Sequence, residues 1–263
     1  AHGNSRQANG SDHQIAHVWE MERLTVAGEP AAHGACVGVG TVAMLALYEW
    51  FLQQDIPAAV ANAMHADGPD SRRVEAEVQA MFAEPSLVAS AMAEARAKLA
   101  RATQRPARLA ALGAAWPGLR TRLESTLVPA ATMAQWLAAC GAASHPADLG
   151  VPLDKLAADY RRARLIRRRY TLLDCLEELG LLDAAIRDLF AADAHRHDPF
   201  EDRDARPAPS AARSDGGGLA HAEGRAVDLD LGVAGPDDEA VARRELLDVR
   251  SHRASAETDH GRR

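Results

Sequence analysis

One apolar stretch determines the fold class: Gly34-Ala-Cys-Val-Gly38-Val-Gly40-Thr-Val-Ala-Met-Leu-Ala-Leu-Tyr-Glu49-Trp-Phe-Leu-Gln-Gln54. On a helix, apolar residues would cover nearly the whole circumference of this segment, which is typical of a central buried helix. Its glycines, Gly34, Gly38 and Gly40, permit another backbone to approach closely. We therefore expect a helical domain built around residues 34–54.

The rest of the chain up to about residue 194 has the same helical character. Apolar residues recur at three- and four-residue spacings, and no extended run of alternating β-branched residues predicts a sheet. Further helices are predicted at about residues 11–24, 71–81, 84–103, 116–125, 130–141, 152–166, 171–179 and 182–194. The expected fold class is all-α, in the form of a helical bundle.

From about His195 the composition changes to Asp, Arg, Pro, Ser and Gly. Such a segment buries too little apolar surface to order itself, so we expect a disordered tail over residues 195–263, with one weak helix near 237–249. Read-through or misassembled sequence is the alternative. The expected organisation is therefore a helical domain over residues 1–194 followed by this tail. His195 and His197, near Asp193 and Asp198, are not expected to form a metal site.

The bulk composition is that of a globular protein: 263 residues, 47% hydrophobic, 25% charged and 4% aromatic. The net charge of -7 and the pI near 5.9 predict no general attraction to nucleic acid or anionic lipid. Three widely spaced cysteines, Cys36, Cys140 and Cys175, fit reduced thiols in the cytoplasm. Neither an export signal nor a membrane-spanning segment is expected.

Two further features have structural interpretations. The run Arg161-Arg-Ala-Arg-Leu-Ile-Arg-Arg-Arg169 could bind phosphate or nucleic acid, but its interleaved apolar residues favour a solvated helix face. Gly38-Val-Gly40 lies inside an apolar helix rather than between a strand and a helix, which favours close helix packing over a dinucleotide-binding turn. The tryptophans are interpreted as core or interface anchors: Trp19, Trp50, Trp116 and Trp136.

Three histidines are the candidates for chemistry. His13 and His17 are four residues apart, so on a helix they share one face and can reach one pocket. His33 stands just before the apolar helix, after a loop through Gly28-Glu-Pro30, where its ring could return to the same pocket. Three converging histidines suit zinc or another divalent metal, although a histidine pair at this spacing is by itself more often a structural polar contact.

The sequence around these histidines resembles the sn-glycerol-1-phosphate dehydrogenases, within the iron-containing alcohol dehydrogenase and dehydroquinate synthase superfamily. In that family a Ser-Arg-Pro-Ala-Ser-Gly-x-Glu-His-x-x-Ser-His segment leads into Trp-Glu-Met, and His-Gly-x-x-Val-Gly-x-Gly-Thr opens the central helix. The matching residues here are Ser5, Arg6, Ala8, Gly10, His13, His17, Trp19, Glu20 and Met21, then His33, Gly34, Val37, Gly38, Gly40 and Thr41. Arg168-Arg-Tyr170-Thr-Leu-Leu-Asp174 and Glu178-Leu-Gly180 are similar to the family's closing helices, so the resemblance spans about residues 4–192.

The resemblance implies that His13 and His33 are metal ligands and that His17 is a catalytic residue that contacts the substrate. It implies zinc, or alternatively nickel or iron, and the reduction of dihydroxyacetone phosphate, a small phosphorylated ketone, with NAD(P)H. This sequence departs from the family pattern at Gln7, Asn9, Asp12 and Ala16, which stand for proline, serine, glutamate and serine. Those departures bear on fine substrate contacts more than on the metal.

The family's third metal ligand is an aspartate from a segment upstream of these motifs, and this chain has no counterpart. Because the chain begins at Ala1 and its first motif follows almost at once, we expect it to be the C-terminal metal-binding half of a two-domain enzyme. NAD(P) would then bind mainly to an N-terminal domain missing from the chain, and the fragment alone would be inactive. The resemblance also implies a homo-oligomer.

Two alternatives remain open. A dehydroquinate synthase-like lyase, or another polyol dehydrogenase, would share the HxxxH and His-Gly elements, but Trp19-Glu-Met21 and the Arg-Tyr-Thr segment favour the dehydrogenase. A non-catalytic helical interaction protein, such as a nucleic-acid binder using the arginine run, would instead show metal-independent stability and salt-sensitive binding.

Overall fold

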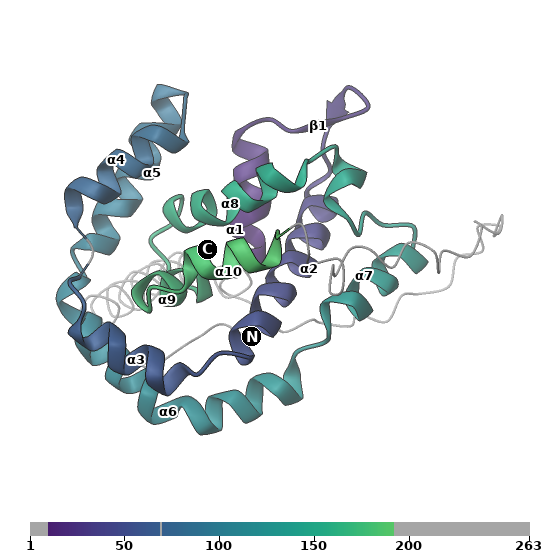
Figure 1. The fold of residues 1–263 in the computed structure, drawn as a ribbon. Coiled ribbons are helices and arrows are strands. Elements are labelled where there is room, and N and C mark those ends of the chain that lie inside the picture. The colour runs from purple at the N-terminus through teal and green to yellow at the C-terminus, as the bar shows by residue number, and fades with distance from the viewer. Residues whose placement is uncertain (1–9, 69, 192–263) are drawn as a thin grey trace, which may run out of the picture. The chain divides into compact units, whose positions relative to one another are not determined.

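The computed structural model describes residues 10–68 and 70–191. This part of the chain is almost entirely helical, as predicted (Figure 1). In chain order the elements are α1 (Ser11–Met21), β1 (Thr25–Val26), β2 (Glu29–Pro30), α2 (His33–Leu52), α3 (Ile56–His65), α4 (Ser71–Met81), α5 (Pro85–Leu99), η2 (Ala102–Gln104), α6 (Arg105–Thr126), α7 (Ala130–Ala139), η3 (Pro146–Leu149), α8 (Leu153–Leu165), α9 (Leu172–Glu178) and α10 (Leu182–Leu189). The predicted tail, with its weak helix near 237–249, lies outside the described residues.

Helix α2 is the central element of the fold. It packs against α1, α7 and α10 (Figure 1). Its buried residues lie around most of its circumference. By length and composition α2 could also cross a membrane, but 61% of its apolar window is buried inside the protein. Burial of this extent is typical of a core helix, which is what the apolar sequence predicts.

Helices α1 and α2 approach each other closely at Gly40. A Cβ atom at this position would lie 2.6 Å from the backbone oxygen of Asp12, closer than any side chain tolerates. At Gly38 a Cβ atom would lie 3.4 Å from the backbone oxygen of Ala143, whereas at Gly34 it would meet nothing within 4 Å. The predicted role of the glycines in close packing is therefore confirmed at Gly40 and Gly38 and is wrong at Gly34.

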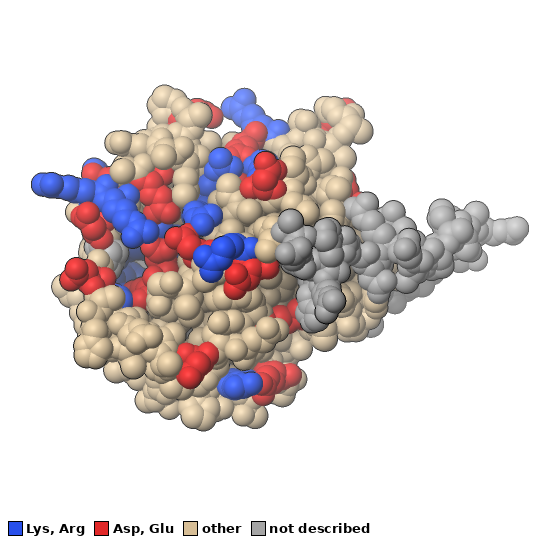
Figure 2. Space-filling model, viewed as in Figure 1, with Lys and Arg blue, Asp and Glu red and all other residues tan. Residues whose placement is uncertain are grey.

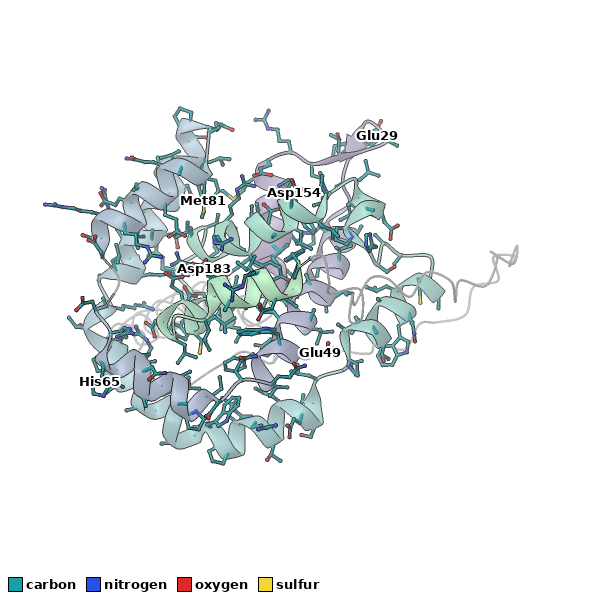
Figure 3. The ribbon with its side chains drawn as sticks, viewed as in Figure 1. Glu29, Glu49, His65, Met81, Asp154 and Asp183 are labelled. Carbon is teal, nitrogen blue, oxygen red and sulfur yellow. The ribbon has the colours of Figure 1, made fainter. Side chains whose placement is uncertain are left out.

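A tight hairpin returns the chain from α1 to the first residue of α2. Strands β1 and β2 are antiparallel, with Val26 opposite Glu29, and the two residues between them have positive φ angles of 53° at Ala27 and 88° at Gly28. Positive φ at both central residues is the geometry of a type I′ turn. Figure 3 shows Glu29 at this hairpin, and the strands place His33 back beside α1.

Helix α1 is held to α8 by a buried polar contact. The indole Nε1 of Trp19 donates a hydrogen bond of 2.7 Å to Oδ2 of Asp159, and both residues are fully buried. Asp159 also accepts from Lys155 Nζ at 3.0 Å and from Arg162 Nη1 at 2.9 Å, so its charge is compensated. Because Lys155 Nζ also contacts Glu22 at the end of α1, this network fixes the rotation of α1.

The arginine run on α8 and after it is engaged within the chain. The interpretation as a solvated face is wrong for Arg164, which is buried. The guanidinium groups of Arg161, Arg164 and Arg168 contact carboxylates on other helices: Asp183 at 2.5 Å, Glu77 at 2.7 Å and Glu94 at 2.7 Å, respectively. Figure 2 shows basic and acidic side chains interspersed on this face, which fits helix-to-helix ion pairing rather than a basic patch.

The structure also contains helical segments that were not predicted. Helix α3 was missed, although Asp55 accepts a hydrogen bond from the Ala58 amide at 3.0 Å and Pro57 lies in the first turn, both of which are ordinary signals of a helix start. Helix α6 begins at Arg105, well before the predicted start at residue 116, and continues through Pro117. Contacts with the rest of the fold, rather than local propensity, support that longer helix.

The tryptophans and cysteines mostly occupy the core. Trp19 and Trp116 are buried, and the ring of Trp116 meets Phe51 edge-on at 5.2 Å between centroids. Trp136 is 55% exposed and so is not a core residue, and its predicted alternative role as an interface anchor stays a prediction. The three cysteines are free thiols, as expected.

We predict that Ala27→Asn stabilises the protein. Alanine is disfavoured at positive φ, whereas Asn-Gly is the preferred pair in a type I′ turn, so the free energy of unfolding should rise by about 0.5–1 kcal/mol. Urea unfolding followed by circular dichroism measures the change. A fall in stability would show that this turn does not form as described.

We predict that Gly40→Ala destabilises the protein by about 1–3 kcal/mol, because the added methyl group forces α1 away from α2. The matched control is Gly34→Ala, which meets no atom within 4 Å and should be neutral or stabilising, since alanine is the better helix former. Urea unfolding of the two variants gives the comparison. Equal effects of the two substitutions would contradict the close contact at Gly40.

Candidate metal centre

The structure brings the three predicted histidines together. His13 and His17 lie one turn apart on α1, and His33 is the first residue of α2. Their ring centroids form a triangle with sides of 5.7 Å between His13 and His33, 5.9 Å between His17 and His33, and 6.4 Å between His13 and His17. The loop and the helix spacing therefore bring the rings into one cluster, as the sequence suggests.

Each of the three imidazoles contacts a carboxylate through its Nδ1 atom. His13 Nδ1 donates to Asp12 Oδ2 at 3.0 Å, and His17 Nδ1 donates to Glu20 Oε2 at 2.8 Å. His33 Nδ1 donates to the other oxygen of Glu20, Oε1. An ionised carboxylate only accepts hydrogen bonds, so in the neutral rings the proton resides on Nδ1 and the Nε2 lone pair is available to a ligand.

The cluster is open to solvent. The side chains of His13 and His17 are 21% and 23% exposed, and that of His33 is 53% exposed. Burial raises the pKa of the Glu20 carboxyl group, but the hydrogen bonds from His33 and His17 and their charge outweigh it, so the net pKa is lowered. Glu20 is therefore ionised at neutral pH, as an acceptor for both rings must be.

The ring spacing can be compared with that of a formed metal site. Three imidazoles that share one tetrahedral zinc ion at 2.0–2.1 Å would have their ring centroids about 5 Å apart. The observed sides are longer by about 1 Å. Within residues 10–68 and 70–191, no group of three or more His, Cys, Asp or Glu side chains is placed so that it could hold a metal ion. Imidazole nitrogens are suitable ligands for a divalent cation, but the rings as described do not form a metal site.

Two other polar side chains lie near the cluster in the sequence. Burial, together with the negative charge of Glu20, raises the pKa of the Cys36 thiol, so Cys36 is protonated at neutral pH and is a poor metal ligand. Gln14, between the two histidines of α1, is 2% exposed, and both atoms of its amide lack a hydrogen-bond partner among the described residues. A buried amide without a partner is costly and is uncommon in folded proteins.

Sequence reasoning did not assign a role to Glu20. The residue was recognised only as part of the Trp-Glu-Met motif, yet it lies three residues after His17 and so on the same face of α1 as both histidines. Asp12 was noted as one methylene shorter than the family glutamate, and its side chain still reaches His13. The remaining motif residues Ser5, Arg6 and Ala8, and the tail histidines His195 and His197, lie outside the described residues.

A short stretch of the chain is similar to the glycerol-1-phosphate dehydrogenase [NAD(P)+] of Halalkalibacterium halodurans. The identity is 43% over 47 residues, which cover 18% of this chain and 12% of the relative. The match therefore spans a small part of both proteins. No family model and no solved structure matches the chain. This similarity weakly suggests a dehydrogenase.

We predict that Gln14→Met raises the free energy of unfolding by about 1 kcal/mol, because it replaces an unpaired buried amide with an apolar chain of similar length. The control is Gln54→Met, which removes a hydrogen bond of 2.9 Å from the Gln54 amide to the Trp50 carbonyl and should not stabilise. Chemical unfolding of both variants tests the difference. If Gln14→Met is the more destabilising change, the Gln14 amide has a partner in solution.

Proposed function

We propose that this chain supplies the metal- and substrate-binding part of an NAD(P)-dependent sn-glycerol-1-phosphate dehydrogenase. His13 and His33 hold a divalent cation, with zinc the first candidate and nickel or iron the alternatives, and His17 contacts the substrate. The dinucleotide-binding fold and the third protein ligand, an aspartate by family resemblance, come from another segment. Among the described residues the only strands are β1 and β2, of two residues each.

One observation carries the proposal: three imidazoles from α1 and the start of α2 meet within 6.4 Å, and each has its Nδ1 atom engaged by a carboxylate. Histidines that ligate metals commonly have this arrangement, because the carboxylate fixes the ring and increases its basicity. The charge balance points the same way. Within the described part of the chain neither Asp12 nor Glu20 has an ion pair with a lysine or arginine, so the cluster is negative and attracts a cation.

The chemistry follows from the roles of these side chains. A divalent cation, when bound, supplies Lewis acidity to the carbonyl oxygen of dihydroxyacetone phosphate, or to the hydroxyl of glycerol 1-phosphate in the reverse direction. His17 lies beside both proposed ligands and can orient the substrate hydroxyl through Nε2 or exchange its proton there. The short similarity to a glycerol-1-phosphate dehydrogenase favours this reaction over a lyase.

Zinc titration of the whole chain tests the metal site. Isothermal titration calorimetry should detect one Zn²⁺ per chain. His13→Ala and His33→Ala should each weaken the zinc affinity by more than about 100-fold, because loss of a metal ligand lowers the affinity at least as much as loss of an outer-shell partner. His65→Ala is the matched control, because His65 lies at the end of α3, away from the cluster (Figure 3). Equal affinities of wild type and the two cluster variants would reject the site.

The reaction itself is tested in a protein that joins this chain to a dinucleotide-binding domain. Dihydroxyacetone phosphate should drive the oxidation of NADH or NADPH, and a chelator should abolish the rate, since the carbonyl is then no longer polarised. His17→Ala should lower kcat while zinc stays bound. Metal binding without any such turnover, together with turnover of a dehydroquinate synthase substrate, would favour the lyase instead.

A further inference from the structure

We propose that Glu20 is a positioning residue that holds His17 and His33 together in the Nδ1–H tautomer. Its two carboxylate oxygens contact different rings, Oε2 that of His17 and Oε1 that of His33. One side chain thereby sets the protonation pattern of two imidazoles that come from different helices. The Nε2 atoms of both rings are left free for a cation or a substrate.

The spacing of residues along one helix does not by itself account for both contacts of Glu20. The contact from His17 is local, three residues away on the same helix, but His33 lies thirteen residues further along, beyond the β1–β2 hairpin. Among the described residues, Glu20 forms the hydrogen bond to the His33 side chain. That side chain is 53% exposed, so few other contacts would restrict its rotation. Glu20 therefore contacts the most exposed ring of the cluster.

The tautomer is what a ligand role requires. In a neutral imidazole one nitrogen carries the proton and only the other can bind a metal or accept a hydrogen bond. Free histidine in water favours the Nε2–H form, in which the outward nitrogen is blocked. A carboxylate that accepts a hydrogen bond from Nδ1–H reverses that preference at both His17 and His33. His13 has a separate carboxylate, Asp12, and does not depend on Glu20.

A purely structural role for Glu20 makes a different prediction. The carboxylate lies near the N-terminus of α2, where a negative charge is favourable for any helix. In that case its removal would lower stability without changing which nitrogen carries the proton. A measurement of the tautomers distinguishes the two roles, because a stability measurement does not show which ring nitrogen carries the proton.

The experiment is long-range ¹H–¹⁵N NMR of the histidine rings in the metal-free full chain, at a pH where the rings are neutral. In the wild type, His13, His17 and His33 should all be Nδ1–H. In Glu20→Ala, His17 and His33 should shift towards Nε2–H while His13 stays unchanged. In Glu20→Gln at most one of the two should remain Nδ1–H, because the amide places an NH₂ donor where one of the two carboxylate oxygens accepts.

Zinc affinity gives the second readout, and this arm rests on the proposed metal site. Glu20→Ala should weaken Zn²⁺ binding by about 10–100-fold, the usual effect of losing an outer-shell carboxylate. The matched control is Glu22→Gln, two residues away, whose carboxylate contacts Lys155 and none of the rings. It should change stability but leave the tautomers and the zinc affinity as they are.

The two hypotheses fail in distinguishable ways. If the tautomers shift in Glu20→Ala but the wild type binds no Zn²⁺, the positioning role stands and the metal site is wrong. If the wild type binds Zn²⁺ but Glu20→Ala leaves the tautomers unchanged, the positioning role is overturned while the metal site stands. An equal loss of zinc affinity in Glu20→Ala and Glu22→Gln would also overturn it.

Discussion

The backbone contact between α1 and α2 at Gly40 is the constraint on which the candidate site depends. All the site residues belong to these two helices, so the distance between the helix axes sets the distance between the imidazoles. Gly40 lies two turns from His33, and the atom that it approaches belongs to Asp12, directly beside His13. Any side chain at this position would therefore separate the two proposed metal ligands. The hairpin adds a second restraint, since its two-residue turn fixes where α2 begins.

Distance alone does not orient the rings, and the Trp19–Asp159 contact supplies the missing restraint. It anchors the inward face of α1 against α8, so the face that bears His13, His17 and Glu20 is held towards the exterior. The buried charge of Asp159 is tolerated because Lys155 and Arg162 compensate it. The outward face carries two carboxylates with no such basic partner in the described residues. A compensated carboxylate thus stabilises the fold on one side of α1, and on the other side Asp12 and Glu20 contact the histidine rings.

Much of the fold and the gathering of the site residues could be predicted from sequence, because both are matters of local periodicity. The apolar circumference of α2 and the four-residue spacing of His13 and His17 are visible in the sequence, and the structure contains both features. What could not be predicted depends on contacts between distant segments. Asp159 carries no sequence signal that marks it as the partner of Trp19, and Arg164 looks solvated until Glu77 is seen beside it. The contact between Glu20 and His17 could have been predicted from their three-residue spacing on a helix. The second contact of Glu20, with His33, depends on the hairpin and could not.

The stiffness of this arrangement bears on how a cation would be held. The rings of the two proposed ligands, His13 and His33, have their centroids 5.7 Å apart, whereas two imidazoles on one zinc ion would have theirs about 5 Å apart. The helices cannot close that gap by approaching each other, because Gly40 and Asp12 are already in backbone contact. In the proposed site, the two ligand rings would have to move closer through rotation about the side-chain bonds of His13 and His33. Such rotation meets little steric hindrance at His33, which is half exposed. It is more restricted at His13 and His17, which are less exposed. His33 is therefore the adjustable ring of the proposed site, and in the role that we propose for Glu20 its carboxylate would limit how far this ring turns.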